Sequence, residues 1–251
     1  MLEVKNVTVS FGGLIAVKDM NINVKKGIIH SLIGPNGAGK TTLFNVITRV
    51  LEPVKGEVNF EGNSLMQTRP DQIIYKGISR TFQNLQLFKG MNVYNNILSG
   101  YLHNYDKNIF YLFSKKRTQF ESVARERILE IAELLQIKNR LNSYPDSLPY
   151  GILKRVEIAR AIVSDPKILL FDEPAAGLNH NETTEIREIM KLLKNKGKTI
   201  FLVEHDMNLV MQVSDRITVM SFGEKIAEGT PKEIANNEEV IKVYLGESEN
   251  A

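Results

Sequence analysis

The chain has 251 residues and a mass of 28.4 kDa, which at about 150 residues per domain allows one large domain or a core with an added lobe. Hydrophobic residues make up 43% and charged residues 24%, ordinary globular values that exclude collagen-like and wholly disordered proteins. Cysteine is absent, which excludes a disulfide scaffold, a thiolate metal site and a thiol nucleophile. A net charge of +3 without a concentrated basic patch argues against nucleic acid as a partner.

The apolar stretches are too short to cross a membrane. The longest wholly apolar runs, such as residues 168–171, fall far short of the 18 or more residues that span a bilayer. Glu3 and Lys5 interrupt the first apolar residues, so the N-terminus lacks the basic-then-apolar order of a signal segment. We therefore expect a chain that is neither exported nor anchored in a membrane by itself.

The first part of the chain predicts strands on either side of a glycine-rich loop. Residues 2–11 alternate between apolar and polar with a shift near Asn6, and residues 20–24 alternate again, as expected of two strands. Residues 28–33 form a mostly apolar run of strand length, and residues 40–47 contain no Gly or Pro, which suits a helix.

Residues 92–161 change to helical periodicity. Asn92 can cap a helix that begins at Val93. A later helix is expected to carry an apolar face of Phe120, Val123, Ile128, Ile131, Leu134 and Leu135. The pattern indicates a helical lobe inserted into the rest of the fold.

Beyond Pro166 the strands resume. Apolar runs at residues 168–171, 200–203 and 217–220 are separated by helix-like segments, the alternation typical of a parallel sheet. The sequence therefore predicts an α/β fold with a core and an inserted helical part.

Residues 34–41 read Gly-Pro-Asn-Gly-Ala-Gly-Lys-Thr and fit the phosphate-loop pattern G-x-x-x-x-G-K-T, after a predicted strand and before a predicted helix. In such a loop backbone N–H groups surround phosphate oxygens, and the helix N-terminus adds partial positive charge. We expect Lys40 to reach the β- and γ-phosphates and Thr41 to bind Mg²⁺. The predicted phosphate-binding residues are Gly34, Pro35, Asn36, Gly37, Ala38, Gly39, Lys40, Thr41 and Thr42.

Two carboxylates, Asp172 and Glu173, end the apolar run at residues 168–171. Alone, such a pair is better explained as part of a turn or a helix cap. If Lys40 and Asp172 belong to one sheet, Asp172 can hold Mg²⁺ through water, and Glu173 can polarise an attacking water molecule.

Several further segments follow in a fixed order along the chain. With these, the sequence resembles the ATP-binding cassette (ABC) ATPases over nearly its whole length. The segments are Phe11, the run Arg80-Thr81-Phe82-Gln83-Asn84, Leu148-Pro149-Tyr150-Gly151 at the position of the family's signature, Ala176-Gly177-Leu178-Asn179, and His205 after Glu204.

The resemblance implies a phosphate-loop NTPase core with an antiparallel β subdomain, formed by residues 1–91 and 162–251, and a helical signature subdomain at residues 92–161. It implies ATP hydrolysis with Mg²⁺ as cofactor. The implied catalytic residues are Glu173, His205 and Lys40; the implied metal ligands are Thr41, Gln83 and Asp172; and Phe11, Gln83, Tyr150 and Gly151 join the phosphate loop in binding nucleotide.

Taken singly, three of these residues have simpler interpretations. Phe11 could pack on the sheet instead of on adenine, Gln83 could be a surface amide, and His205 a structural histidine. Only their joint order supports the functional roles.

The signature differs from the common family form Leu-Ser-Gly-Gly-Gln. Pro149 replaces the Ser, Tyr150 the first Gly and Ile152 the Gln, whereas Gly151 is kept. This Tyr-Gly form and the chain's ending, from Gly223 through residues 244–246, look most like the ATPase subunits of branched-chain amino acid importers. Lipopolysaccharide-export ATPases are the alternative within the family; soluble cassette proteins of DNA repair or translation and a phosphate-loop kinase are rivals outside transport.

The resemblance also implies partners. Two ATPase chains sandwich two nucleotides, so a second ABC ATPase is expected, in a heterodimer or alternatively a homodimer. Separate transmembrane permease subunits would hold the chain at the cytoplasmic face of the membrane as a peripheral protein, and a solute-binding protein would act indirectly. The segment from Gln83 to about Asn96 resembles the part that receives the permease. Within it, residues 84–91, the docking loop, are unusually apolar; the alternative is core filler beneath the helical lobe.

Overall fold

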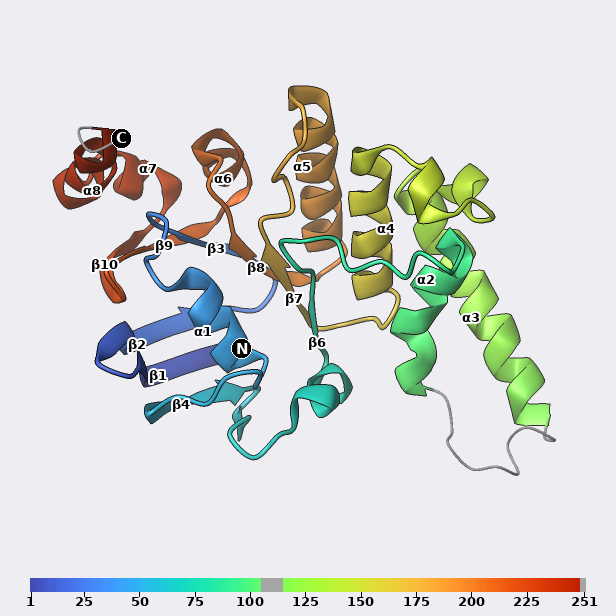
Figure 1. Ribbon diagram of the computed structural model, residues 1–251, viewed down its shortest axis with the longest axis horizontal. Helices are drawn as coiled ribbons and strands as arrows, with labels where there is room; N and C mark the ends of the chain where they lie inside the picture. Colours follow the sequence, from blue (N-terminus) through green and yellow to red (C-terminus); the bar gives the residue numbers. More distant parts are fainter. Residues whose placement is uncertain (105–114, 249–251) are drawn as a thin grey trace.

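The computed structural model describes residues 1–104 and 115–248 (Figure 1). Its N-terminal part is a four-stranded antiparallel sheet in the order β2-β1-β4-β5. The strands are β1 (Leu2–Phe11), β2 (Leu14–Val24), β4 (Lys55–Phe60) and β5 (Asn63–Ser64). The predicted shift near Asn6 is confirmed, because the β1–β2 pairing changes register between Val4 and Val7 and Asn6 has a φ of 49°.

The second sheet has six strands in the order β10-β9-β3-β8-β7-β6. From β9 to β6 all neighbours are parallel, as predicted, and only β10 pairs antiparallel at the edge. The strands are β3 (Ile29–Ile33), β6 (Ile78–Arg80), β7 (Ile168–Asp172), β8 (Thr199–Val203), β9 (Arg216–Ser221) and β10 (Glu224–Gly229). The three-residue strand β6 was not expected from the sequence.

Both faces of the central strands are buried. In β7, Leu169 and Phe171 enter one hydrophobic cluster with the helices, whereas Ile168 and Leu170 enter a second cluster with the antiparallel sheet. A strand covered on both faces has no polar side to show, which explains the continuous apolar runs of the sequence.

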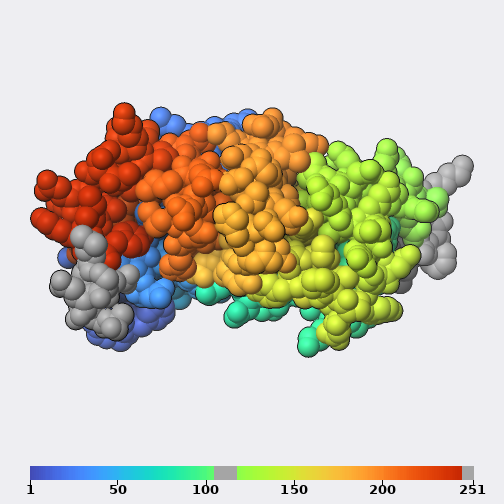
Figure 2. Space-filling model, turned by 90° about the horizontal axis from the view of Figure 1, so that it is seen from above, coloured from blue at the N-terminus to red at the C-terminus, as the bar shows by residue number. Residues whose placement is uncertain are grey.

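Helices cover the sheet and extend to one side of it. They are α1 (Lys40–Ile47), α2 (Val93–Tyr101), α3 (Lys115–Leu134), α4 (Tyr150–Ile162), α5 (His180–Asn195), α6 (Met207–Val213), α7 (Pro231–Ala235) and α8 (Glu238–Ser248). Figure 2 shows the face formed largely by the segments from α4 to α6, with the C-terminal helices at one end and the α2–α3 part at the other. Within the described ranges, no helix combines the length and apolar character that crossing a membrane requires.

The helical part agrees with the sequence at its start and differs in one face. Asn92 caps α2, since its side chain accepts a hydrogen bond from the Asn95 N–H, as predicted. The predicted face of α3 was wrong at Val123, which is 44% exposed. Ala124 is buried in place of Val123, whereas the predicted Ile128, Ile131 and Leu135 are buried as expected.

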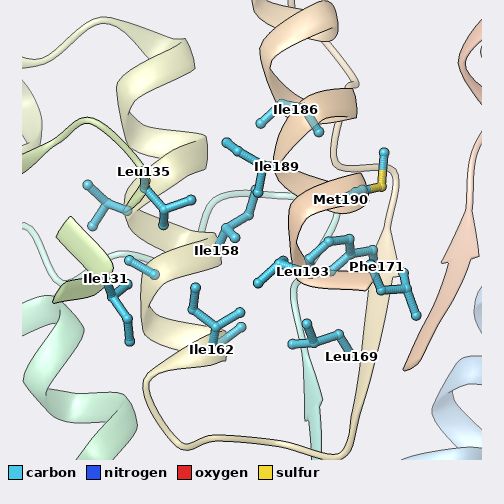
Figure 3. Packing of buried hydrophobic residues seen from close by; sticks show 14 of the residues in the cluster. Ile131, Leu135, Ile158, Ile162, Leu169, Phe171, Ile186, Ile189, Met190 and Leu193 are labelled. Atoms are coloured by element: carbon cyan, nitrogen blue, oxygen red, sulfur yellow. The ribbon is translucent and has the colours of Figure 1, made fainter. Parts of the chain in front are cut away.

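Helix α4 lies between α3 and α5 (Figure 3). Its Ile158 and Ile162 point towards the α5 residues Ile189 and Leu193, beside Phe171 of β7, in one buried cluster. The helix that begins at Tyr150 is thereby fixed to the parallel sheet through α5.

A close contact between α2 and α4 generates a stability prediction. A Cβ added at Gly100 would lie 2.1 Å from the carbonyl oxygen of Arg160. We expect Gly100→Ala to lower the free energy of unfolding by about 1–3 kcal/mol, because overpacking outweighs the roughly 1 kcal/mol that Ala gains over Gly in a helix. Urea unfolding of the purified chain measures the change.

The matched control is Gly13→Ala, since a Cβ at Gly13 meets no atom within 4 Å. We expect that change to stay within about 0.5 kcal/mol. Equal unfolding midpoints for the Gly100 variant and the unaltered chain would show that the two helices separate freely.

Candidate functional site

The predicted site residues follow the carboxyl ends of four neighbouring parallel strands. β3 leads into the phosphate loop, β8 into Glu204 and His205, β7 into Glu173, and β6 into Gln83. Leu32 of β3 and Asp172 of β7 both pair with Val203 of β8, so one row crosses all three strands. Lys40 and Asp172 are therefore positioned by one sheet, which was the condition for reading Asp172 and Glu173 as a functional pair.

The phosphate loop needs glycine at two close backbone contacts. At Gly34 a Cβ would lie 2.0 Å from the carbonyl oxygen of Met220, and at Gly39 it would lie 2.3 Å from that of Ala16. Gly39 also precedes α1 with a φ of 99°, a left-handed conformation that side chains oppose. These contacts fix the loop between β2, β9 and the start of α1.

Lys40 is the first residue of α1 and is 5% exposed. Its ammonium donates hydrogen bonds to the carbonyl oxygens of Gly34 (2.6 Å) and Pro35 (2.7 Å). The positive charge is thus held inside the loop, at the positive end of a helix, where an anion gains from both.

The loop opens into a cleft of about 280 Å³. The cleft is lined by Ala16, Asn36, Gly37, Ala38, Gly39, Lys40, Thr41, Thr42, Gln83, Glu173 and His205. The structure therefore brings the phosphate loop together with residues that are 43 to 165 positions further along the chain than Lys40. Phe11, Tyr150 and Gly151 are outside this lining.

Glu173 is held by two of the predicted site residues. Gln83 Nε2 donates to Glu173 Oε2 at 2.8 Å, and His205 Nε2 is 2.7 Å from Glu173 Oε1. Glu173 has a φ of 49°, a conformation that non-glycine residues adopt at a cost and that is frequent at active sites. A carboxylate oriented into the cleft in this way can accept a proton from a water molecule.

Asp172 is 1% exposed and is not among the residues that line the cleft. Its Oδ2 forms a 2.7 Å ion pair with Arg80, while its Oδ1 has no hydrogen-bond partner within the described part of the chain. A buried carboxylate oxygen with free acceptor capacity, together with the Thr41 hydroxyl in the cleft, suits Mg²⁺, which prefers oxygen ligands and keeps several waters. A Mg²⁺ ion held by these residues would supply positive charge next to the phosphate loop.

Phe11 and the signature residues face other surroundings. Phe11 ends β1 and is 52% exposed, so it is not packed into the sheet. Tyr150 begins α4 after Pro149, and its ring lies against Gly177: a Cβ at Gly177 would be 3.2 Å from it. A Cβ at Gly151 would lie 2.3 Å from Glu182 Oε1, so a larger residue at this position would displace the Glu182 side chain.

Glu204 has a role that the sequence did not predict. It is 3% exposed and accepts hydrogen bonds from the N–H groups of Ala175 (2.8 Å) and His205 (3.0 Å). Burial raises the pKa of Glu204, and these backbone donors act in the opposite direction. The carboxylate thereby connects the loop after Glu173 to the loop that carries His205. The one sequence feature that could have indicated this role is the position of Glu204 directly after a buried strand.

Charged residues of α4 hold the segment that carries Gln83 and were also missed. Lys154 Nζ donates to the Gln83 carbonyl (3.1 Å), and Glu157 Oε1 accepts from the Phe82 N–H (3.3 Å). Arg160 donates to the carbonyl of Gln86. Burial lowers the pKa of Lys154 and raises that of Glu157, and each group opposes the shift of the other. Their spacing of three residues along one helix face was the only signal in the sequence.

Comparison with known proteins identifies relatives over the whole chain. A family model described as ABC transporter matches residues 17–176, and one described as branched-chain amino acid ATP-binding cassette transporter matches residues 224–250. The chain is 43% identical over 254 residues to the high-affinity branched-chain amino acid transport ATP-binding protein LivG of Escherichia coli (strain K12), covering 99% of this chain and 98% of that protein.

Two solved structures share the fold. The ADP conformation of an ATP-binding cassette of an ABC transporter is 32% identical, with a TM-score of 0.85 and 98% of each chain covered. A dimeric post-hydrolysis state of an ATP-binding cassette, bound to ADP and Pi, is 28% identical, with a TM-score of 0.78, covering 92% of this chain and 99% of the other. The expected α/β fold is thereby confirmed.

The position of Lys40 in the phosphate loop predicts that its removal weakens ATP binding. Lys40→Ala removes the buried ammonium from the phosphate loop, so we expect ATP affinity to fall by about 10-fold or more, the scale of a lost charge-assisted contact. Fluorescence titration with a labelled ATP measures it, with Lys18→Ala as control because Lys18 is exposed and pairs with Glu224. Equal ATP affinity in the Lys40 variant and the unaltered chain would contradict the assignment.

Proposed function

This chain belongs to the ABC transporter family of ATPases, and on that basis we propose that it powers the import of branched-chain amino acids through separate transmembrane subunits. The observation that carries the cargo class is the near-complete, 43% identical match to a branched-chain amino acid transport ATP-binding protein. The match of residues 224–250 to a branched-chain family model supports the same class from a separate part of the chain.

The chain is an ATPase, and we assign its site residues from the geometry. Glu173 activates the attacking water, because its two oxygens are oriented by Gln83 and His205 at the cleft. Lys40 binds the β- and γ-phosphates, and His205 stands where it can donate towards the γ-phosphate. Phe11, half-exposed at the end of β1, is assigned to adenine.

For Mg²⁺ we assign Thr41, Asp172 and Gln83 as the residues that would hold the ion. The Thr41 hydroxyl and the Asp172 carboxylate are oxygen ligands, which Mg²⁺ prefers. Gln83 offers an amide oxygen once its side chain turns away from Glu173. The proposed site therefore combines a phosphate-binding loop with two carboxylates, Asp172 and Glu173, at the end of β7.

The site is assigned a second half from another chain. Tyr150 is 41% exposed, and neither Tyr150 nor Gly151 lines the cleft, so we assign this helix start to a nucleotide held by a partner ATPase. A dimeric cassette with ADP and Pi is among the similar structures. Because Pro149 removes a signature hydroxyl, we propose that the partner is a different ABC ATPase; a homodimer is the alternative. Residues 92–161 are assigned as the signature subdomain.

The docking loop (residues 84–91) is the proposed contact with the permease. Phe88 is 52% and Met91 41% exposed, whereas Leu87 is half-buried against the cluster of the helical part, so Phe88 and Met91 are the side chains that the loop offers to a partner. Buried Asn96 fixes it, accepting from the Phe88 N–H (2.8 Å) and donating to the Phe88 and Met91 carbonyls (3.1 and 3.0 Å). An apolar surface on a fixed backbone suits a partner helix. Docking there places the chain at the cytoplasmic face of the membrane, with a solute-binding protein acting only through the permease.

The proposed role of Glu173 predicts a specific kinetic defect. Glu173→Gln keeps the size of the side chain and an acceptor for Gln83 but removes the base, so hydrolysis should slow by about 10²- to 10⁴-fold while Mg-ATP binding is preserved. Phosphate release and labelled-ATP binding, measured on the same preparation, check both parts. Unchanged turnover would rule out Glu173 as the residue that activates water.

The proposed docking surface predicts a separation of binding from assembly. Phe88→Asp should leave ATP binding by the isolated chain intact, because Phe88 is exposed, and should abolish co-purification with the permease subunits and transport in vesicles. Val54→Asp is the matched control, since Val54 is an exposed apolar residue (68%) near β4. Normal assembly of the Phe88 variant would place the docking surface elsewhere.

A further inference from the structure

Arg80 is a buried cation next to Asp172, the carboxylate assigned to Mg²⁺. The sequence did not predict a role for Arg80, and the assigned mechanism does not use it. Its side chain is 7% exposed, and that of Asp172 is 2% exposed. Nη2 donates to Asp172 Oδ2 at 2.7 Å, while Nη1 donates to Asn45 Oδ1 at 2.7 Å and to Thr48 Oγ1 at 3.3 Å. One guanidinium thus joins the last residue of β7 to two residues at the end of α1 and just beyond it.

The guanidinium is fixed in direction as well as in contact. Its central carbon lies 5.6 Å from the centre of the Phe44 ring and 5.2 Å from that of Phe82. A planar group that faces aromatic rings and also donates several hydrogen bonds in a fixed fork is particular to Arg, because the Lys ammonium lacks the fork. Arg80 therefore has little freedom to turn away from Asp172.

The ion pair with Arg80 leaves the two carboxylate oxygens of Asp172 in different states. Oδ2 is occupied by Arg80, and the buried Oδ1 is without a hydrogen-bond partner among the described residues. A carboxylate held by one oxygen presents the other in one orientation, the arrangement by which hydrogen-bonding partners orient metal ligands.

We propose that Arg80 is a positioning residue that orients Asp172 for Mg²⁺ and links it to the segment carrying Gln83. Arg80 ends β6, three residues before Gln83. The same short segment therefore contacts Asp172 through Arg80 and Glu173 through Gln83. A displacement of this segment reaches both carboxylates at once. The proposal rests on the assignment of Asp172 to the metal.

The test measures how much Mg²⁺ strengthens nucleotide binding. The affinity of the purified chain for labelled ATP is titrated with excess EDTA and again with Mg²⁺, and the ratio of the two dissociation constants is the metal-dependent gain. For Arg80→Met we expect this gain to fall by about 10- to 100-fold, the usual loss when the partner of a metal ligand is removed. Affinity in EDTA should change by less than about 3-fold, because Arg80 is outside the cleft lining.

Two further variants separate positioning from stability. Arg49→Met removes another buried arginine, just after α1, which bonds Glu52 and the Met66 carbonyl and does not contact Asp172. It should lower the unfolding temperature and leave the metal-dependent gain unchanged. Arg80→Lys keeps the charge without the planar fork, so it should fold and recover only part of the gain.

The outcomes are distinct. If Arg80→Met and Arg80→Lys lower affinity equally with Mg²⁺ and with EDTA, or keep the full gain, Arg80 is only a structural ion pair and the proposal is overturned. If Arg80→Met does not fold, a full metal-dependent gain in Arg80→Lys is enough to overturn the proposal. If the unaltered chain shows no metal-dependent gain, the metal assignment itself fails, and this proposal fails with it.

Discussion

The site exists because four parallel strands end at one edge of a sheet that is buried on both faces. Burial of both faces fixes the register of β3, β8 and β7, since a slip of one residue would turn each side chain to the opposite cluster. Fixed register places Leu32, Val203 and Asp172 in one row. Each loop that lines the cleft therefore begins at a fixed strand end, and the sheet sets the positions of the cleft residues.

Polar groups behind this edge are organised in pairs. Arg80 with Asp172, and Lys154 with Glu157, are charges that have left water, and such pairs seldom add net stability. Removing one partner, however, typically costs about 3–5 kcal/mol because the other charge is left buried.

The sequence predicted the features that are local in the chain. The phosphate loop, the Asn92 cap and the break in β1 near Asn6 depend on neighbouring residues, and the structure confirms the loop's strand–loop–helix context, the cap and the break. On α3 the predicted apolar face was right at Ile128 and Ile131 and wrong at Val123, where the adjacent Ala124 is buried instead.

Contacts between distant residues could not be predicted in the same way. Arg80 and Asp172 are 92 positions apart, and Lys154 and Gln83 are 71 apart. Nothing in the local pattern of either residue identifies its partner, and the short strand β6, which brings Arg80 to the sheet, has too few residues to show a period. Tertiary structure, not propensity, gives these residues their roles.

The central claim is that the nucleotide cleft and the docking loop are connected through Gln83. Gln83 contacts Glu173 in the cleft, and its neighbour Phe82 and the following Gln86 are bonded to α4. Hydrogen–deuterium exchange of the purified chain, with and without Mg²⁺ and a non-hydrolysable ATP analogue, tests this most directly. The account predicts altered exchange at residues 82–91 together with protection of residues 34–42. Protection confined to residues 34–42, with exchange at 82–91 unchanged, would contradict it.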